Sequence, residues 1–279
     1  MRIAFLGTPD DAVPTLRALV GAGHDVALVV TQPDRRRGRG AATAPSPVKA
    51  AALELGLPVR TPARSREVVD EMRASGATLG AVVAFGQLLP DALLDALPHG
   101  FVNLHFSLLP RWRGAAPVER AILAGDTETG VSVMRIDAGL DTGPVYAVER
   151  APIEPDETAG ELRARLAELG TALMVATLPR VPDLEPVAQE GEPTYADKLD
   201  VAEFELDWSR PADELLRIIR AGNPRPGAWT TVDGTRLKLW QARTAPDGTV
   251  EPIEVQAEGK PRTTWAAWKR GHPDIRLGS

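Results

Sequence analysis

Short apolar runs alternate with segments of helical pattern through the first part of the chain. Apolar runs bounded by Gly or Pro predict strands at residues 2–7, 25–31, 57–62, 79–86 and 100–106. Helical patterns lie between them at 13–21, 46–56, 66–76 and 90–98. This alternation predicts an α/β fold, a Rossmann-like and mostly parallel sheet with helices on both faces. Ligand sites in such sheets gather at the carboxyl ends of the strands.

The pattern changes after about residue 144. A strand at 144–153 and a long helix at 158–178 precede a stretch rich in Pro, Glu and Gly, which is typical of a surface linker. An amphipathic helix at 211–222 and a hairpin at 228–243, with Asp233-Gly234 as its turn, follow. We predict one domain at 1–180, a linker at 181–199 and a smaller β-rich domain at 200–279.

Composition narrows the classes of protein. The 279 residues carry a formal net charge of −6, so nucleic-acid binding requires a local basic patch. Cysteine is absent, which removes disulfides, thiolate nucleophiles and Cys-ligated metals. No apolar run reaches the ~18 residues of a membrane-spanning helix, and the first residues enter a strand without a signal peptide's apolar core. We expect a cytoplasmic protein with no membrane partner.

Polar residues interrupt the apolar run at 101–106. Alternate side chains of a strand share a face, so Asn103, His105 and Ser107 fall on one side and Val102 and Leu104 on the other. One interpretation is a satisfied polar strand end, with His105 bonded to a backbone carbonyl. The other is a site in which an amide and an imidazole act together. Of the four histidines, His105 is the best placed for proton transfer.

Asp137 and Asp141 form a second polar group, in a Gly-rich loop between apolar segments. They can be turn chemistry alone. If a carboxylate lies near His105, however, it favours the imidazolium form. Asn, His and Asp together can stabilise an oxyanion, move a proton and orient the imidazole, which suits acyl transfer to an amine without a covalent intermediate. A G-x-S-x-G nucleophile motif is absent.

Two arginine-containing loops stand out. Residues 33–40 read PDRRRGRG, which is either a solvated flexible loop or a loop that binds phosphates, because Arg pairs with phosphate as a fork and Gly permits close approach. Arg111, Trp112 and Arg113 follow the polar strand end, and they can stack or bind near a substrate.

The stretch from Asn103 to Tyr146, which contains SLLPRWRGAAP and GLDTGP, resembles the core of the methionyl-tRNA formyltransferase family. RIAFLGTPD, TQPDRRRGRG with PSPVK, VVAFGQLLP and NPRPGAW also resemble segments of that family, so the resemblance covers most of residues 1–240. It implies a small OB-like C-terminal domain, here in a reduced form because the chain is shorter than expected.

The resemblance also implies roles for individual residues. The catalytic residues that it implies are Asn103, His105 and Asp141. The implied folate contacts are Phe85, Gly86, Gln87, Leu88, Leu89, Pro90, Ser107, Leu108, Leu109, Pro110, Ile136, Asp137 and Gly139. The implied tRNA contacts are Arg35, Arg36, Arg37 and Arg39. No metal is implied.

The function implied is transfer of a formyl group from 10-formyltetrahydrofolate, a co-substrate, to the α-amino group of methionine on charged initiator tRNA. Attack is direct and passes through a tetrahedral intermediate. The alternative is a folate-dependent formyltransferase that acts on a small amine, such as an amino sugar or peptide precursor. The arginine loop favours the first, and the shortened C-terminal domain favours the second. We expect a monomer.

Overall fold

A computed structural model of the chain describes residues 1–36, 43–275 and 277. The chain forms two compact units, and each is assembled from separate stretches. The first comprises Met1–Arg113, Gly130–Ala151 and Ala164–Tyr195, and the second comprises Gly114–Thr129, Pro152–Arg163 and Ala196–Ser279. The predicted domain boundaries are linear, whereas these units are interleaved along the chain.

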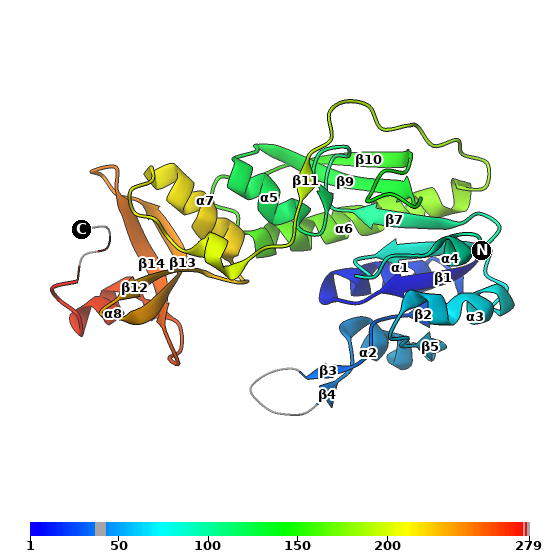
Figure 1. Ribbon diagram of the computed structural model, residues 1–279, viewed down its shortest axis with the longest axis horizontal. Coiled ribbons are helices and arrows are strands. Elements are labelled where there is room, and N and C mark those ends of the chain that lie inside the picture. Colours follow the sequence, from blue (N-terminus) through cyan, green and yellow to red (C-terminus); the bar gives the residue numbers. More distant parts are fainter. Residues whose placement is uncertain (37–42, 276, 278–279) are drawn as a thin grey trace. The chain divides into compact units, whose positions relative to one another are not determined.

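A seven-stranded sheet forms the centre of the first unit (Figure 1). Its strands, in spatial order, are β10 (Val145–Pro152), β9 (Glu128–Arg135), β7 (Phe101–His105), β6 (Leu79–Val83), β1 (Arg2–Gly7), β2 (Asp25–Val30) and β5 (Val59–Arg60). From β5 to β7 the neighbours pair in parallel, and β9 pairs antiparallel to β7. The predicted mostly parallel sheet is therefore confirmed.

Helices cover both faces of this sheet because its strands are apolar on both sides. On one face, Ala4 and Leu6 of β1 pack in a cluster with Val68 and Met72. On the other face, Leu104 of β7 meets the backbone of the long helix at Gly170. The helices of the first unit are η1 (Asp10–Ala12), α1 (Val13–Gly21), α2 (Pro47–Glu54), η2 (Ser65–Val68), α3 (Val69–Ala74), α4 (Asp91–Leu94), most of α6 (Ala159–Thr177) and η3 (Leu178–Arg180).

Local signals predicted several of these elements well. The Ser46 hydroxyl accepts a hydrogen bond of 3.0 Å from the Lys49 amide, so Ser46 caps α2 as the pattern indicates. The strand predicted at 79–86 ends earlier, at Val83, because Ala84 and Gly86 have φ of +46° and +80°. These left-handed residues turn the chain away at the carboxyl end of β6.

The second unit contains a four-stranded antiparallel sheet. Its strands are β12 (Ala228–Val232), β13 (Thr235–Thr244), β14 (Val250–Ala257) and β15 (Thr263–Thr264). Its helices are α5 (Pro117–Ala124), η4 (Val201–Phe204), α7 (Ala212–Gly222) and α8 (Trp265–Arg270). The predicted turn is present, since Asp233 and Gly234 have φ of +48° and +74°. The predicted β-rich C-terminal part of the fold is thus confirmed, whereas the bounds of a separate domain at 200–279 stay a prediction.

Two elements go beyond the predicted pattern. Helix α5 follows the arginine-tryptophan loop and begins at Pro117. Strand β9 is buried on both faces, so it lacks the alternation of a half-buried strand. Short strand pairs complete the structure: β3 (Arg35–Arg36), β4 (Thr43–Ala44), β8 (Arg113–Gly114) and β11 (Tyr195–Ala196).

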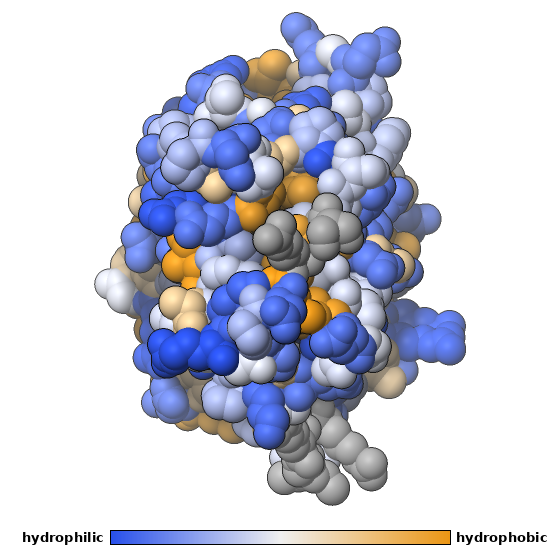
Figure 2. Space-filling view, turned by 90° about the vertical axis from the view of Figure 1, so that its left-hand side faces the viewer, coloured by the Kyte–Doolittle hydropathy of each residue, from blue (hydrophilic) through white to orange (hydrophobic). Residues whose placement is uncertain are grey.

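Figure 2 shows one face that is largely hydrophilic, with hydrophobic residues in small separate patches. Among the described residues, no helix has the length and apolar character that a membrane span requires.

Candidate active site

The polar residues of β7 lie on the face of the sheet that carries the pocket. Asn103 pairs in register with Val82 of β6 and with Met134 of β9, and all three line one cavity. His105 is two residues further along the same face and is only 5% exposed. The period of two thus placed Asn103 and His105 correctly, on a common face at the carboxyl end of a strand.

His105 is held from the loop that follows it. Its Nε2 lies 2.8 Å from the carbonyl oxygen of Trp112, and a carbonyl only accepts, so this nitrogen carries the proton. Trp112 adopts a left-handed φ of +62°, and its amide donates to the Thr194 hydroxyl at 2.8 Å. The backbone of this loop therefore fixes the plane and the tautomer of the imidazole.

The rest of the Arg-Trp-Arg loop is engaged in the same unit. The Arg111 guanidinium lies over the Trp112 ring, 4.5 Å from its centroid. The Arg113 guanidinium donates to Gln189. The contacts described for this loop therefore hold residues of the site in place, whether or not the loop also contacts a substrate.

Asp141 faces the other nitrogen of the imidazole. Its Oδ2 is 3.6 Å from His105 Nδ1, within ion-pair range but longer than a hydrogen bond. The Asp141 side chain is 20% exposed, whereas that of His105 is 6% exposed. An acceptor therefore lies near each ring nitrogen, a carbonyl at hydrogen-bond distance and a carboxylate at ion-pair distance.

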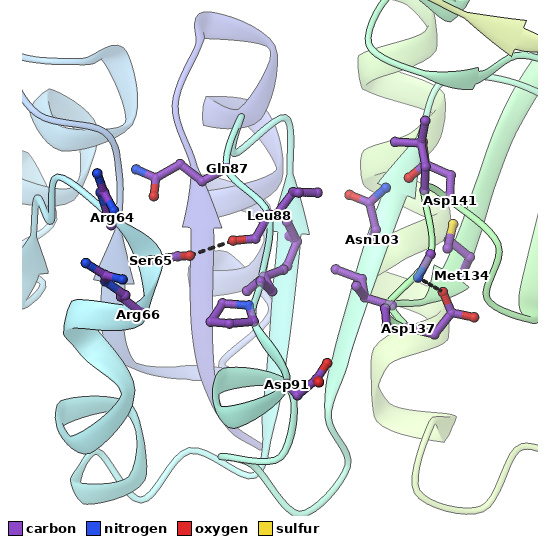
Figure 3. Close-up of a pocket in the computed structure, with 17 residues that line it drawn as sticks. Arg64, Ser65, Arg66, Gln87, Leu88, Asp91, Asn103, Met134, Asp137 and Asp141 are labelled. Atoms are coloured by element: carbon purple, nitrogen blue, oxygen red, sulfur yellow. Dashed lines mark hydrogen bonds between the residues drawn. The ribbon is translucent and has the colours of Figure 1, made fainter.

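A cavity of about 540 Å³ opens in front of these residues. Figure 3 shows Asn103 between the segment that carries Gln87 and Leu88 and the loop that carries Asp137 and Asp141. The volume lies in the range typical of small-molecule sites, which is roughly 300–1,000 Å³. Asn103 and Asp141 both line it, and His105 contacts Asp141 at 3.6 Å.

Exposed leucines line this cavity. Leu88 is 81% exposed and Leu140 is 51% exposed, an unusual state for large apolar side chains that share one pocket. Exposed apolar surface in a concave site commonly marks contact with a ligand.

The structure places the predicted folate residues in two groups. Those that line the cavity are Gln87, Leu88, Leu89, Pro90, Ile136, Asp137 and Gly139. The others are not among its lining residues. The Phe85 side chain is buried in the core, and Gly86 meets the Gln32 side chain. Strand β7 ends at His105, so Ser107 lies in the bend that follows and not on the strand. It is fully buried, and its hydroxyl donates to the carbonyl of Arg111. Residues Leu108, Leu109 and Pro110 follow it in the bend, with a cis Leu109–Pro110 bond.

Sequence reasoning missed the opposite wall of the cavity. Arg64, Ser65 and Arg66 lie there, and the Ser65 hydroxyl donates to the Leu88 carbonyl at 2.5 Å (Figure 3). The remaining unpredicted lining residues are Val82, Asp91, Met134, Ala138 and Leu140. The sequence offered one signal for this wall, which is two arginines at alternate positions soon after Pro62. Both Arg64 and Arg66 are exposed in the structure.

The arginine loop lies partly outside the described residues. Arg37 and Arg39 are not described, and only the backbone of Arg36 is. The Arg35 guanidinium donates to Gln32, whose amide donates to the Phe85 carbonyl at 3.0 Å. In the described part of the chain, no three His, Asp or Glu side chains cluster as metal ligands would.

The chain matches known families and proteins over most of its length. The formyl transferase model matches residues 1–178, and the formyl transferase C-terminal domain model matches residues 198–251. A methionyl-tRNA formyltransferase of Roseobacter denitrificans is 53% identical over 248 residues, which is 88% of this chain and 81% of that protein. One from Thermus thermophilus is 46% identical over 304 aligned positions, covering 100% of this chain and 99% of that protein.

Solved structures share the fold at low identity. HypX from Aquifex aeolicus has a TM-score of 0.71 at 15% identity over 99% of this chain, which spans 48% of that protein. Methionyl-tRNA formyltransferase from Clostridium thermocellum has a TM-score of 0.64 at 15% identity, covering 92% of this chain and 98% of that one. Because the identities to curated relatives are high over nearly the full length, this chain belongs to the methionyl-tRNA formyltransferase family, within the formyl transferases.

Proposed function

We propose that the chain transfers the formyl group of 10-formyltetrahydrofolate to the α-amino group of methionine on charged initiator tRNA. The observation that carries this proposal is the pairing of His105 with Asp141 beside a cavity lined by Asn103, in a chain about half identical to methionyl-tRNA formyltransferases. The same identities favour the tRNA acceptor over a small amine.

Each of the three residues has a distinct role. The amine nitrogen attacks the formyl carbon, and negative charge develops on the formyl oxygen. The Asn103 amide, which makes no hydrogen bond with any other described side chain, donates to that oxygen. His105 takes at Nδ1 the proton that the amine loses, and it gives that proton to the folate nitrogen as the bond between this nitrogen and the formyl carbon breaks. Asp141 faces the imidazole and stabilises its charged form.

The cavity suits the folate co-substrate. Leu88 and Leu140 offer exposed apolar surface to a flat ring, and ring edges can be read by the backbone of the segment from Gln87 to Pro90. Arg64 and Arg66, on the opposite wall, offer cations to the carboxylates of the glutamyl tail. In this proposal, Ser107, Leu108, Leu109 and Pro110 shape the bend beside the site, and the chemistry needs no metal ion.

The remaining features follow from the same proposal. The arginines at 35, 36, 37 and 39 bind phosphates of the tRNA. The protein acts as a cytoplasmic monomer on its two substrates.

Transfer to defined acceptors tests this function. Wild type and His105→Ala are incubated with 10-formyltetrahydrofolate and either methionine-charged initiator tRNA or a panel of amino sugars and peptides. We expect the wild type to formylate the charged tRNA, and His105→Ala to lose roughly 10²–10⁴-fold in rate because general base catalysis is removed. Since His105 is buried, circular dichroism is needed as a folding control. Formylation of a small amine in place of the charged tRNA would refute the proposal.

A further inference from the structure

The loop that carries Asp141 is held from behind by a residue outside the pocket. Gln189 lies in the stretch after η3, where Val187 pairs with Val145 at the start of β10 through hydrogen bonds of 2.7 and 2.8 Å. This pairing fixes the register of the stretch against the sheet, two residues before Gln189. All of these residues belong to the first unit.

The Gln189 side chain bridges two groups. Its amide nitrogen donates to the carbonyl oxygens of Asp141 and Gly143, each at 2.8 Å. Its Oε1 accepts from Nε and Nη2 of Arg113, at 3.0 and 2.7 Å. A guanidinium can only donate, so Arg113 fixes which end of the amide faces the loop. Both N–H groups of Gln189 are therefore directed at the backbone around Asp141.

The loop needs such support because its backbone is strained. Asp141 has φ of +49°, a region that non-glycine residues rarely adopt. Gly143 is packed so closely that an added Cβ would lie 1.9 Å from the Arg135 carbonyl oxygen. On the inner side, the Asp137 carboxylate accepts from the Gly139 amide at 3.0 Å and from the Thr142 hydroxyl at 2.6 Å. Gln189 supplies the matching restraint on the outer side.

We propose that Gln189 is a positioning residue, which acts through the Asp141 backbone to keep the Asp141 carboxylate facing His105. It touches neither the cavity nor His105, so its effect passes through Asp141. Arg113 orients Gln189 and thereby links the loop after β7 to the loop after β9. This inference rests on the proposed function.

Two substitutions separate the parts of this bridge. Gln189→Ala removes it, whereas Gln189→Glu keeps an acceptor for Arg113 and removes both donors to the loop. We expect each to lower kcat by about 10- to 100-fold, because displacement of a catalytic group by about 1 Å costs that much. KM for the folate should not change, so the loss should appear in kcat alone. Glu190→Gln, an exposed neighbour, is the matched control and should behave as wild type.

A double-mutant cycle tests the route of the effect. Gln189→Ala is combined with Asp141→Ala, and we expect no further loss of kcat beyond that of Asp141→Ala alone. An equal loss factor in both backgrounds would overturn the proposal, as would wild-type kcat in both Gln189 variants. If circular dichroism shows that Gln189→Ala is poorly folded, the same double-mutant cycle is measured with Gln189→Glu in its place. Failure of the proposed function is distinct, because wild type and Glu190→Gln would then also be inactive on charged tRNA.

Discussion

Among the residues of β7, Asn103 is the one that lines the cavity. Its neighbours on β7 pack into the core, but its own side chain lines the cavity and lies between the two walls that Figure 3 shows. A buried strand tolerates a half-buried amide poorly unless the amide is hydrogen-bonded. In the proposed function, a substrate oxygen supplies this acceptor, which recovers the cost of placing Asn103 there.

Asn103→Ala should therefore act on the transition state. We expect kcat to fall by roughly 10²–10³-fold, as loss of one oxyanion donor does elsewhere, with little change in KM for the folate. Steady-state formyl transfer measured against folate concentration checks this. A rise in KM at constant kcat would show instead that Asn103 only binds ground-state substrate.

At the scale of elements, α5 illustrates how a helix that was not predicted from the sequence is held. Arg120 of α5 donates to both carboxylate oxygens of Glu203 in η4, at 2.5 and 3.1 Å, within the second unit. Arg120 also donates to the carbonyls of Asp197 and Lys198. These bonds tie α5 to the start of the stretch that leads to α7.

This pair makes stability depend on pH. The hydrogen bond from Arg120 lowers the pKa of Glu203 below its ordinary value. Because this pKa is lower in the folded state, the ionised carboxylate stabilises the fold above the unfolded-state pKa of about 4.3. The contribution is lost as the pH falls from there through the folded-state pKa. Glu203→Gln should cost about 0.5–1 kcal/mol at pH 7, a small amount because the Glu203 carboxylate is partly solvated. The difference from wild type should shrink below about pH 4.

Urea denaturation at several pH values measures this difference. Glu205→Gln, which changes an exposed carboxylate two residues further along the chain, is the control. A cost for Glu203→Gln that is the same at pH 7 and pH 3 would contradict an ionic contribution from this pair.

At the scale of the whole molecule, net charge limits how the chain can bind a polyanion such as tRNA. The net charge of −6 opposes a polyanion, so binding of tRNA depends on a local group of cations. The cluster at Arg35, Arg36, Arg37 and Arg39 is the densest in the sequence, although the structure describes only its first side chain.

Arg39→Ala should weaken tRNA binding and leave folate affinity unchanged. Each neutralised phosphate adds about −0.7 to −0.9 to the slope of log affinity against log salt, so the slope should shrink by about one unit. Binding of charged initiator tRNA at several salt concentrations checks this, with Arg17→Ala as a charge-matched control on α1. Equal slopes for wild type and Arg39→Ala would remove the role proposed for this loop.

Short-range physics in the chain was enough to predict much of this molecule. The period of two put Asn103 and His105 on one face, Ser46 marked the start of α2, and Asp233-Gly234 marked a turn, because each signal depends only on neighbouring residues. The family resemblance then singled out Asp141, which local patterns could not distinguish from turn chemistry.

Tertiary structure alone decided which distant residues meet. His105 is oriented by the Trp112 carbonyl, Asp141 faces it from another loop, and Gln189 reaches that loop from a linker-like stretch. Arg64 and Arg66 likewise join the cavity only because η2 lies beside the segment after β6, where Ser65 bonds to Leu88. These contacts follow from strand order and backbone path, which set distances between residues far apart in sequence and leave no periodic trace in the sequence itself.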